Sequence, residues 1–309
     1  MVHPFLSIVI ANYNYGRFLE EAIQSIVSQG MGNKVEIIIC DAASTDNSVE
    51  IIKKYEKYIS WWCSEPDGGQ SAAFNKGFSH AKGRFLTWLN ADDIFIPGSL
   101  KRVVDYIENH PCVEWISGGT VFCNGDMQIE RMRIGASVPP MSKRYLPMHV
   151  IGGPSSFFSA QRLLEVGGVD EQLHYVMDID LWHKFFAAGM KLVHLKLYVW
   201  GFRMHEASKT ASSLIGSVSE GHRNEELAWR NTKAKLRYDP SRGERLLFIW
   251  KILTGSYLKS WYDTKRLKSL HYMSIGDCSY RMSVAMRSLK IDAIKGFAIL
   301  CVVLFDILR

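Results

Sequence analysis

The stretch Phe85-Leu86-Thr87-Trp88-Leu89-Asn90-Ala91-Asp92-Asp93 decides the fold class, because an apolar run ends there in two adjacent carboxylates. The apolar part predicts a buried strand, and a buried strand does not keep ionised side chains inside. Asp92 and Asp93 are therefore expected at its carboxyl end, where open α/β sheets bind their ligands. Two carboxylates at such an edge suit a divalent cation that holds phosphate, and an acidic turn is the alternative.

Strand and helix patterns alternate around this stretch over residues 1–110. Apolar and β-branched runs predict strands at residues 6–11, 35–40, 59–63 and 84–89. Helical spacing predicts helices at residues 18–27, 69–80 and 97–109, and a further one that ends at Tyr55 and that Ser44-Thr45-Asp46 can cap. Strands that alternate with helices of this length indicate βαβ units and a mostly parallel sheet.

The pattern changes after residue 112. Short strands with a turn at Gly125 are expected over residues 113–133, followed by helices at 159–166 and 178–188 and a strand at 191–200. Strand signals end near Gly216, after which helices carry interleaved aromatic and basic residues. We therefore expect an α/β domain at residues 1–215 and a basic, aromatic-rich helical region at residues 216–309.

Composition and charge narrow the class of protein. The chain of 309 residues is 47% hydrophobic and 22% charged, as globular proteins are, and its formal charge of +6 comes from the last third. Its six cysteines show no CxxC spacing, which favours reduced thiols in the cytoplasm over a zinc site. We expect no signal peptide, and the longest apolar run, residues 296–305, is too short to span a bilayer.

A polar cluster follows each of the first four predicted strands. The clusters are Ala11-Asn12-Tyr13-Asn14, Asp41-Ala42-Ala43-Ser44-Thr45-Asp46, Glu65-Pro66-Asp67-Gly68-Gly69-Gln70 and Asn90-Ala91-Asp92-Asp93. Each alone is ordinary turn chemistry. Because parallel strands end at one edge of a sheet, the four loops together predict a crevice lined by carboxylates, amides and an aromatic ring.

These clusters, in this order, resemble the family 2 glycosyltransferases of GT-A fold. The resemblance continues through Asn75-Lys76-Gly77, Gly153-Pro154-Ser155-Ser156-Phe157-Phe158, Gly167-Gly168-Val169-Asp170, Asp178-Ile179-Asp180-Leu181-Trp182 and Arg203-Met204-His205 with Ser208. It covers about residues 5–212. It implies a nucleotide-sugar-binding α/β fold with a mostly parallel central sheet, and an inverting transfer of a sugar to an acceptor hydroxyl.

The resemblance also assigns a donor site by position. Asp41 and Asp67 correspond to residues that contact the nucleotide base, and the ring of Tyr13 can pack on base or ribose. Asp92 corresponds to the residue that binds the ribose. The remaining members of the expected nucleotide-sugar site are Ala11, Gln70 and Asn75.

The resemblance also implies a bound divalent metal. Asp93 corresponds to the ligand of Mg²⁺ or Mn²⁺, which neutralises the leaving diphosphate. His205 corresponds to a residue that helps to hold the metal or the diphosphate, as neutral imidazole can. Lys76 could reach a phosphate, but a solvated helix face explains it equally well.

Asp178 corresponds to the general base that takes the proton of the acceptor hydroxyl. The family usually has Glu before this Asp, and Met177 stands here instead, which leaves Asp180 open as the alternative base. Two residues apart on a helix, the two carboxylates point to different faces. Alternatively, Asp178 is the residue that caps the N-terminus of this helix. His174, His183 and His194 are expected to be structural.

The expected partners are a nucleotide-sugar donor, with a UDP-sugar favoured, and a saccharide or lipid-linked saccharide acceptor in cell-surface polysaccharide or glycolipid synthesis. Nucleic acid is not expected. The aromatic and basic residues of the tail predict contact with the inner face of the cell membrane, and helix packing or a homodimer is the alternative. A sugar nucleotidyltransferase and a non-catalytic nucleotide-sugar-binding protein are the rival functions. The sequence leaves the sugar, the acceptor and the metal open.

Overall fold

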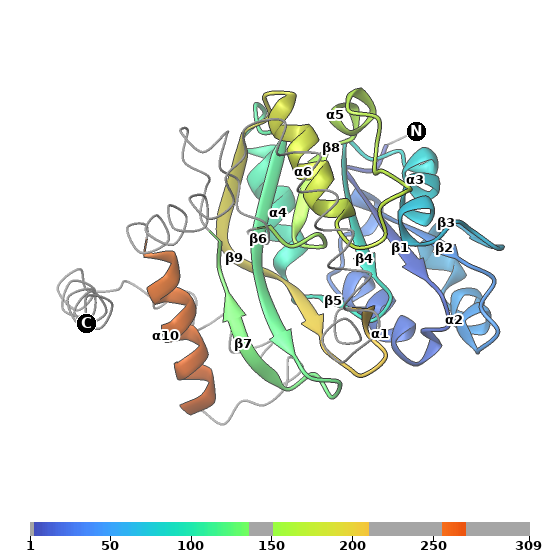
Figure 1. Ribbon diagram of the computed structural model, residues 1–309, viewed down its shortest axis with the longest axis horizontal. Coiled ribbons are helices and arrows are strands. Elements are labelled where there is room, and N and C mark those ends of the chain that lie inside the picture. Colours follow the sequence, from blue (N-terminus) through green and yellow to red (C-terminus); the bar gives the residue numbers. More distant parts are fainter. Residues whose placement is uncertain (1–2, 136–150, 210–254, 270–309) are drawn as a thin grey trace.

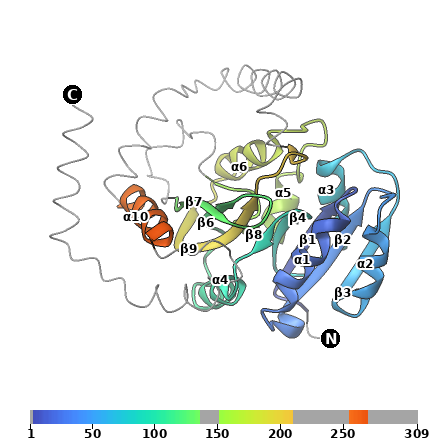
Figure 2. The same ribbon diagram turned by 90° about the horizontal axis from the view of Figure 1, so that it is seen from below.

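One curled sheet forms the centre of the computed structural model, which describes residues 3–135, 151–209 and 255–269 (Figures 1 and 2). In these ranges the strand order is β3-β2-β1-β4-β8-β6-β9-β5, with β7 paired to β6. The strands are β1 (Leu6–Asn12), β2 (Val35–Asp41), β3 (Ile59–Ser64), β4 (Phe85–Asn90), β5 (Ile94–Phe95), β6 (Trp115–Cys123), β7 (Ile129–Arg133), β8 (Ser156–Ser159) and β9 (Leu192–Arg203).

The first half of the sheet is parallel, as predicted. β1 pairs in parallel with both β2 and β4, and β2 pairs in parallel with β3. Beyond β4 the sheet is mixed, because β8 is antiparallel to both β4 and β6, whereas β9 runs parallel to β6. The mostly parallel α/β sheet expected from the sequence is therefore confirmed.

Helices cover both faces of the sheet (Figure 2). Ile8 and Ile10 of β1 belong to the core under α1, α2 and α4, whereas Val9 belongs to the core under α3, α5 and α6. Because both faces are buried, the strand is a continuous apolar run. The helices are α1 (Gly16–Val27), α2 (Ser48–Lys54), α3 (Gln70–His80), α4 (Ser99–Glu108), α5 (Ala160–Glu165) and α6 (Met177–Ala187), with the 3-10 turns η1 (Gly32–Lys34) and η2 (Glu56–Tyr58).

A stack of three tryptophans holds α6 on the sheet. The rings of Trp88 in β4 and Trp182 in α6 lie 5.6 Å apart between centroids and 8° from parallel. Trp182 in turn stacks on Trp115 of β6 at 5.2 Å. Buried aromatic pairs of this kind stabilise beyond the area they bury, so the stack fixes the position of the first turn of α6.

A helix from the last third of the chain, α10 (Ser256–Ser269), packs its polar side on the outer strand β7 (Figure 1). Ser260 Oγ accepts a hydrogen bond from Ile134 N (2.9 Å), and Thr264 Oγ1 accepts one from Met132 N (3.1 Å). These hydroxyls satisfy N–H groups at the edge of the sheet, where strand partners are missing.

The other side of α10 exposes two aromatic rings. Trp261 and Tyr262 are 44% and 42% exposed, and Lys265 Nζ lies 4.7 Å from the centre of the Trp261 ring. The remainder of residues 216–309 lies outside the described ranges, as do the expected boundary at residue 215 and the apolar run at 296–305. Of the helices described, none is long and apolar enough to cross a membrane.

Two boundaries differ from the prediction. The second helix begins at Ser48 and not at the expected cap, because Asp46 accepts hydrogen bonds from Gly16 N (2.8 Å) and from the N and Oγ of Ser48. Asp46 thereby holds the first residues of α1 and α2 together, and Asn47 occupies the N-cap position of α2. The last strand continues past residue 200 to Arg203, which adds Phe202 to the sheet.

Candidate active site

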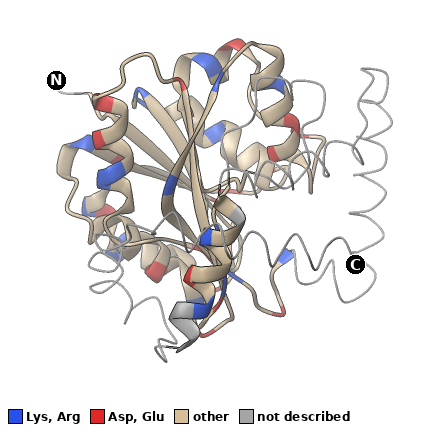
Figure 3. Cartoon of the chain, turned by 90° about the vertical axis from the view of Figure 1, so that its left-hand side faces the viewer, with Lys and Arg blue, Asp and Glu red and all other residues tan. Residues whose placement is uncertain are grey.

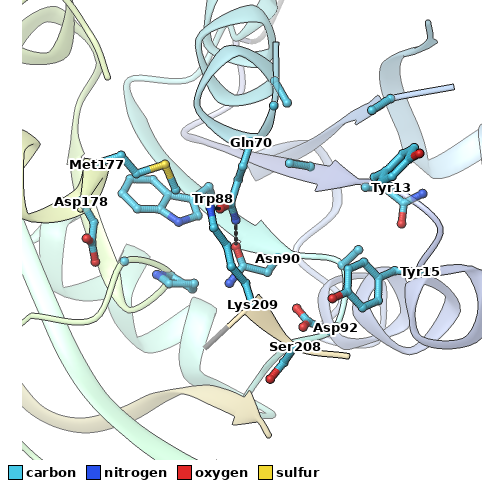
Figure 4. Close-up of a pocket in the computed structure, with 18 of the residues that line it drawn as sticks. Tyr13, Tyr15, Gln70, Trp88, Asn90, Asp92, Met177, Asp178, Ser208 and Lys209 are labelled. Carbon is cyan, nitrogen blue, oxygen red and sulfur yellow. Dashed lines mark hydrogen bonds between the residues drawn. The ribbon is translucent and has the colours of Figure 1, made fainter. Parts of the chain in front are cut away.

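A pocket of about 700 Å³ opens at the carboxyl ends of β1 and β4 and is also lined by α3 and α6 (Figure 4). Its volume is within the range of small-molecule sites, about 300–1,000 Å³. The structure brings six of the predicted residues together in its lining: Ala11, Tyr13, Asp67, Gln70, Asp92 and Asp178.

Asp41, which the resemblance places beside the nucleotide base, lies behind the pocket wall and is not part of the lining. Its carboxylate accepts hydrogen bonds from Asn12 Nδ2 (2.6 Å) and Ser64 Oγ (2.5 Å), and from both N and Oγ of Ser44. Asp41 is 1% exposed, and its neighbour Ala42 lines the pocket instead. The carboxylate therefore holds three loops of the site in place.

Asn75, which the resemblance assigns to the donor site, also lies outside the pocket lining. Its Nδ2 donates to Val169 O (2.8 Å) and to Glu171 Oε1 (2.9 Å), and its Oδ1 accepts from Val169 N (3.0 Å). The side chain fastens α3 to the loop that precedes α6. Lys76 forms an ion pair with Glu65 and does not line the pocket.

Asp92 faces the pocket and is held from behind by His205. His205 Nε2 lies 3.1 Å from Asp92 Oδ2, and Arg17 Nη2 lies 3.2 Å from His205 Nδ1. Because arginine only donates, Nδ1 accepts, and the network assigns the ring proton to Nε2, which donates to Asp92. With its side chain 6% exposed, His205 reaches the pocket only through Asp92.

Asp93 is fully buried and turned away from the pocket. Its Oδ1 accepts a hydrogen bond from Arg203 N (3.0 Å), and its Oδ2 accepts one from Asn90 Nδ2 (2.8 Å). Burial and the neighbouring charge of Asp92 raise the pKa of Asp93 well above its usual value. Of the two adjacent carboxylates, Asp92 is the one that the structure presents to a ligand.

The donor atoms around Asp92 suit Mg²⁺ or Mn²⁺. Carboxylate oxygens are preferred ligands of both ions, which commonly keep water and phosphate oxygens in their other positions. Within the described ranges, no three His, Cys, Asp or Glu side chains gather as a complete ligand set. A metal here would take an oxygen of Asp92 as a protein ligand.

Asp178 reaches the pocket from the first turn of α6 (Figure 4). The helix begins at Met177 with Val176 as its N-cap, so Asp178 is not the capping residue. Burial raises the pKa of Asp178 to about 6, against the lowering effects of the Ile179 backbone N–H and the Lys209 charge. A carboxyl with this pKa is a base near neutral pH.

Asp180 lies on a different side of α6. It is 5% exposed, does not line the pocket, and lies 3.1 Å from Lys184 Nζ, one turn along the helix. Met177, which stands where the family usually has Glu, packs in the core with its sulfur 3.0 Å from Ser71 Oγ. Of the two carboxylates of α6, Asp178 alone is placed for chemistry in the pocket.

The sequence argument missed an aromatic and basic part of the lining. Lys209 Nζ donates to the carbonyl of His174 and lies 3.4 Å from Gln70 Oε1, while Gln70 Nε2 donates to Asn90 (2.8 Å) (Figure 4). In the sequence, Lys209 could have been noticed only because it directly follows Ser208, the last residue of the resemblance. The aromatic and basic lining residues that the sequence analysis did not assign to the site are Tyr15, Trp88, Tyr175, Trp200, Phe202 and Lys209.

Comparisons with known proteins identify the family of this chain. The family model described as Glycosyl transferase family 2 matches residues 7–162. An uncharacterized glycosyltransferase of Rickettsia typhi is 26% identical over 222 residues, which are 68% of this chain and 67% of that protein.

Two solved structures share the fold. S. aureus TarS 1-349 in complex with UDP-GlcNAc matches with a TM-score of 0.55 and 16% identity over 76% of each chain. The mannosyltransferase PcManGT from Pyrobaculum calidifontis, in complex with GDP-Man and Mn²⁺, matches with a TM-score of 0.57 and 15% identity, over 94% of this chain and 82% of that one.

The fold is of the GT-A type, with its pocket at the carboxyl ends of parallel strands. The family model spans half of the sequence, and the chain belongs to glycosyl transferase family 2.

Proposed function

We propose that the protein is an inverting, divalent-metal-dependent glycosyltransferase that moves a sugar from a nucleoside-diphosphate sugar to an acceptor hydroxyl. The observation that carries the proposal is the presence of Asp92 and of Asp178, with its raised pKa, in one pocket (Figure 4). UDP-GlcNAc in TarS, and GDP-Man with Mn²⁺ in PcManGT, support a nucleotide-sugar donor and a divalent metal. We favour a UDP-sugar.

The parts of the pocket divide the work between donor and acceptor. Tyr13, 60% exposed, offers its ring to the base, and Asp67 and Gln70 supply polar contacts beside it. Asp92 binds the ribose. Asp178 accepts the proton of the acceptor hydroxyl while that oxygen attacks the anomeric carbon from the side opposite the diphosphate. One such displacement inverts the anomeric configuration.

The leaving diphosphate needs a counter-charge, and a bound Mg²⁺ or Mn²⁺ supplies it. Asp92 would hold the ion at the pocket face. Asp93 would join it by exchanging its hydrogen bonds to Asn90 and Arg203 for the metal. His205 would keep Asp92 oriented, or become a ligand itself if its proton moved from Nε2.

A panel of UDP-, GDP- and dTDP-sugars tests the proposal by metal-dependent release of nucleoside diphosphate, with product stereochemistry read by NMR. Excess EDTA and Asp93→Ala should each abolish release of nucleoside diphosphate. Added Mn²⁺ should restore release to the EDTA-treated wild type but not to Asp93→Ala. Full activity in EDTA would disprove metal dependence. Binding without release would favour a sugar-sensing protein, and pyrophosphate formed from a sugar phosphate and a nucleoside triphosphate would favour a nucleotidyltransferase.

We also propose that the enzyme works at the inner face of the cell membrane, in the synthesis of cell-surface polysaccharide or glycolipid. Exposed Trp261 and Tyr262, with Lys265 beside them, are residues suited to the headgroup region of an anionic leaflet. A lipid-linked acceptor would make such contact useful.

A further inference from the structure

Two rows of side chains cross β9, β6 and β7, from the pocket to the edge of the sheet. The strand register aligns Phe202 with Phe122, and Phe122 with Arg131. The second row consists of Trp200, Thr120 and Arg133. Laterally aligned residues point to the same face of a sheet, so the two rows share one face, on which Thr120, Phe122 and Trp200 are buried and Arg131 is exposed. The inner end of this face, Trp200 and Phe202, is part of the pocket lining.

The outer end of this face holds two guanidinium groups over one ring. Arg131 Cζ lies 4.2 Å and Arg133 Cζ 5.2 Å from the centroid of Phe122, which packs edge-on against Phe202 at 5.7 Å. Burial and the charge of Arg131 lower the pKa of Arg133 to about 10, so both groups are charged at neutral pH. Stacking on Phe122 holds two like charges together.

Arg131 is open to a ligand. It is exposed on the surface, and among the residues that the structure describes no carboxylate forms an ion pair with it. Arginine binds phosphate in a bidentate manner and favours planar, stacked positions such as this one.

We propose that Arg131 and Arg133 bind a phosphate group of the acceptor, and that the pocket end of this face, where Trp200 and Phe202 line the cavity, carries the acceptor's sugar. The proposal rests on the proposed function and narrows it to phosphate-bearing acceptors. The two arginines are two strand spacings, about 10 Å, from β9 and the pocket. A soluble sugar phosphate and a lipid-linked sugar diphosphate share this chemistry.

The first experiment does not depend on turnover. Inorganic phosphate is titrated into the full chain saturated with UDP, and arginine side-chain resonances are followed by NMR. We expect saturable shifts of Arg131 and Arg133 in wild type and roughly 10-fold weaker binding in Arg131→Gln, because a charge-assisted contact is lost. No shift at either arginine, or equal affinity in the variant, would overturn the proposal.

The second experiment compares a neutral alkyl glycoside with the same sugar as a soluble phosphate, and as an alkyl diphosphate in vesicles. Arg131→Gln should lower kcat/KM for a phosphorylated acceptor by roughly 10- to 100-fold, mainly through KM, and leave the neutral acceptor unchanged. Whichever phosphorylated form loses more identifies the source of the phosphate. Equal losses on neutral and phosphorylated acceptors would overturn the proposal.

Arg84→Gln is the matched control. Arg84 is also exposed and also stacks on phenylalanine rings, at 6.0 Å from Phe5 and 5.6 Å from Phe85, but it does not line the pocket. It should leave phosphate binding and kcat/KM at wild-type values. Failure of the proposed function would look different, because no nucleotide sugar would then release nucleoside diphosphate with any acceptor.

Discussion

Asp178 is the residue on which the proposed chemistry depends most directly. Asp178→Asn keeps the shape of the side chain and removes its basicity, so turnover should fall by roughly 10²–10⁴-fold while the Kd for the nucleotide sugar stays unchanged. Single-turnover kinetics and calorimetric titration measure the two quantities separately. Asp180→Asn is the control, because Asp180 lies on another side of α6 beside Lys184. A dead Asp180→Asn with an active Asp178→Asn would reverse the assignment.

The pKa of Asp178, raised to about 6 by burial, makes two pH effects predictable. The kcat/KM of the wild type should fall as pH drops below about 6, because the base becomes protonated. Stability should change in the opposite direction. Between the unfolded value of about 4 and the folded value, the native state holds the extra proton, so the free energy of unfolding falls as pH rises through this window. Asp178→Asn should lack this fall in a comparison of Tm at pH 4.5 and pH 7.5.

Single residues also mark how far the sequence could predict the site. Tyr13, Asp67, Asp92 and Asp178 lie in the pocket as expected, because each lies shortly after the end of a strand or in the first turn of a helix at the sheet edge. Asp41 and Asn75 do not. Their amide and hydroxyl partners come from loops 3 to 94 residues away, and no local pattern indicates where such hydrogen bonds go.

At the level of elements, α10 makes a testable contribution to stability. In Ser260→Ala the Ile134 N–H loses its acceptor at the edge of the sheet, and a buried donor without a partner costs about 1–3 kcal/mol. Urea unfolding should show this as a lower midpoint with an unchanged m-value. Ser260→Thr, which keeps the hydroxyl, should remain close to wild type. Equal midpoints for the two variants would mean that the hydroxyl is not needed.

Elements differ in how well periodicity predicts them. The strands β1, β2 and β4 and the amphipathic helices α1 and α4 were expected near their observed positions, whereas β6 is a nine-residue strand where short strands were expected. β5 has two residues and β8 four, too few to display a period, and both exist because neighbouring strands supply hydrogen-bond partners. The extension of β9 to Arg203 has the same origin, since its last residues pair with β6.

At the scale of the whole molecule, the exposed aromatic residues of α10 allow the proposed membrane contact to be tested. Figure 3 views the side of the molecule that carries α10. Trp261→Ala should reduce sedimentation of the full chain with vesicles of anionic lipid, and added salt should weaken the binding of the wild type. Failure of the wild type to sediment would favour packing or dimerisation by the tail.

Tyr58→Ala is the control for that experiment. Tyr58 is 44% exposed, as Trp261 is, and Lys57 Nζ lies 4.8 Å from its ring centroid, so it presents the same pair of groups elsewhere on the surface. Tyr58→Ala should sediment with the vesicles as the wild type does, and only Trp261→Ala should show reduced sedimentation. If both variants lose binding to the same extent, the contact is an unspecific property of exposed aromatic residues.

The stacked tryptophans give the pocket an optical signal of its own. Trp88 lines the cavity and is nearly parallel to Trp182, which stacks on Trp115, so the three indoles couple electronically and should produce paired bands of opposite sign in near-ultraviolet circular dichroism. A nucleotide sugar placed against Trp88 should quench emission and change the amplitude of those bands. Trp88→Phe should abolish the change in those bands, leaving only the emission response of Trp200, which also lines the pocket. Donor occupancy could then be followed in stopped-flow experiments without a label.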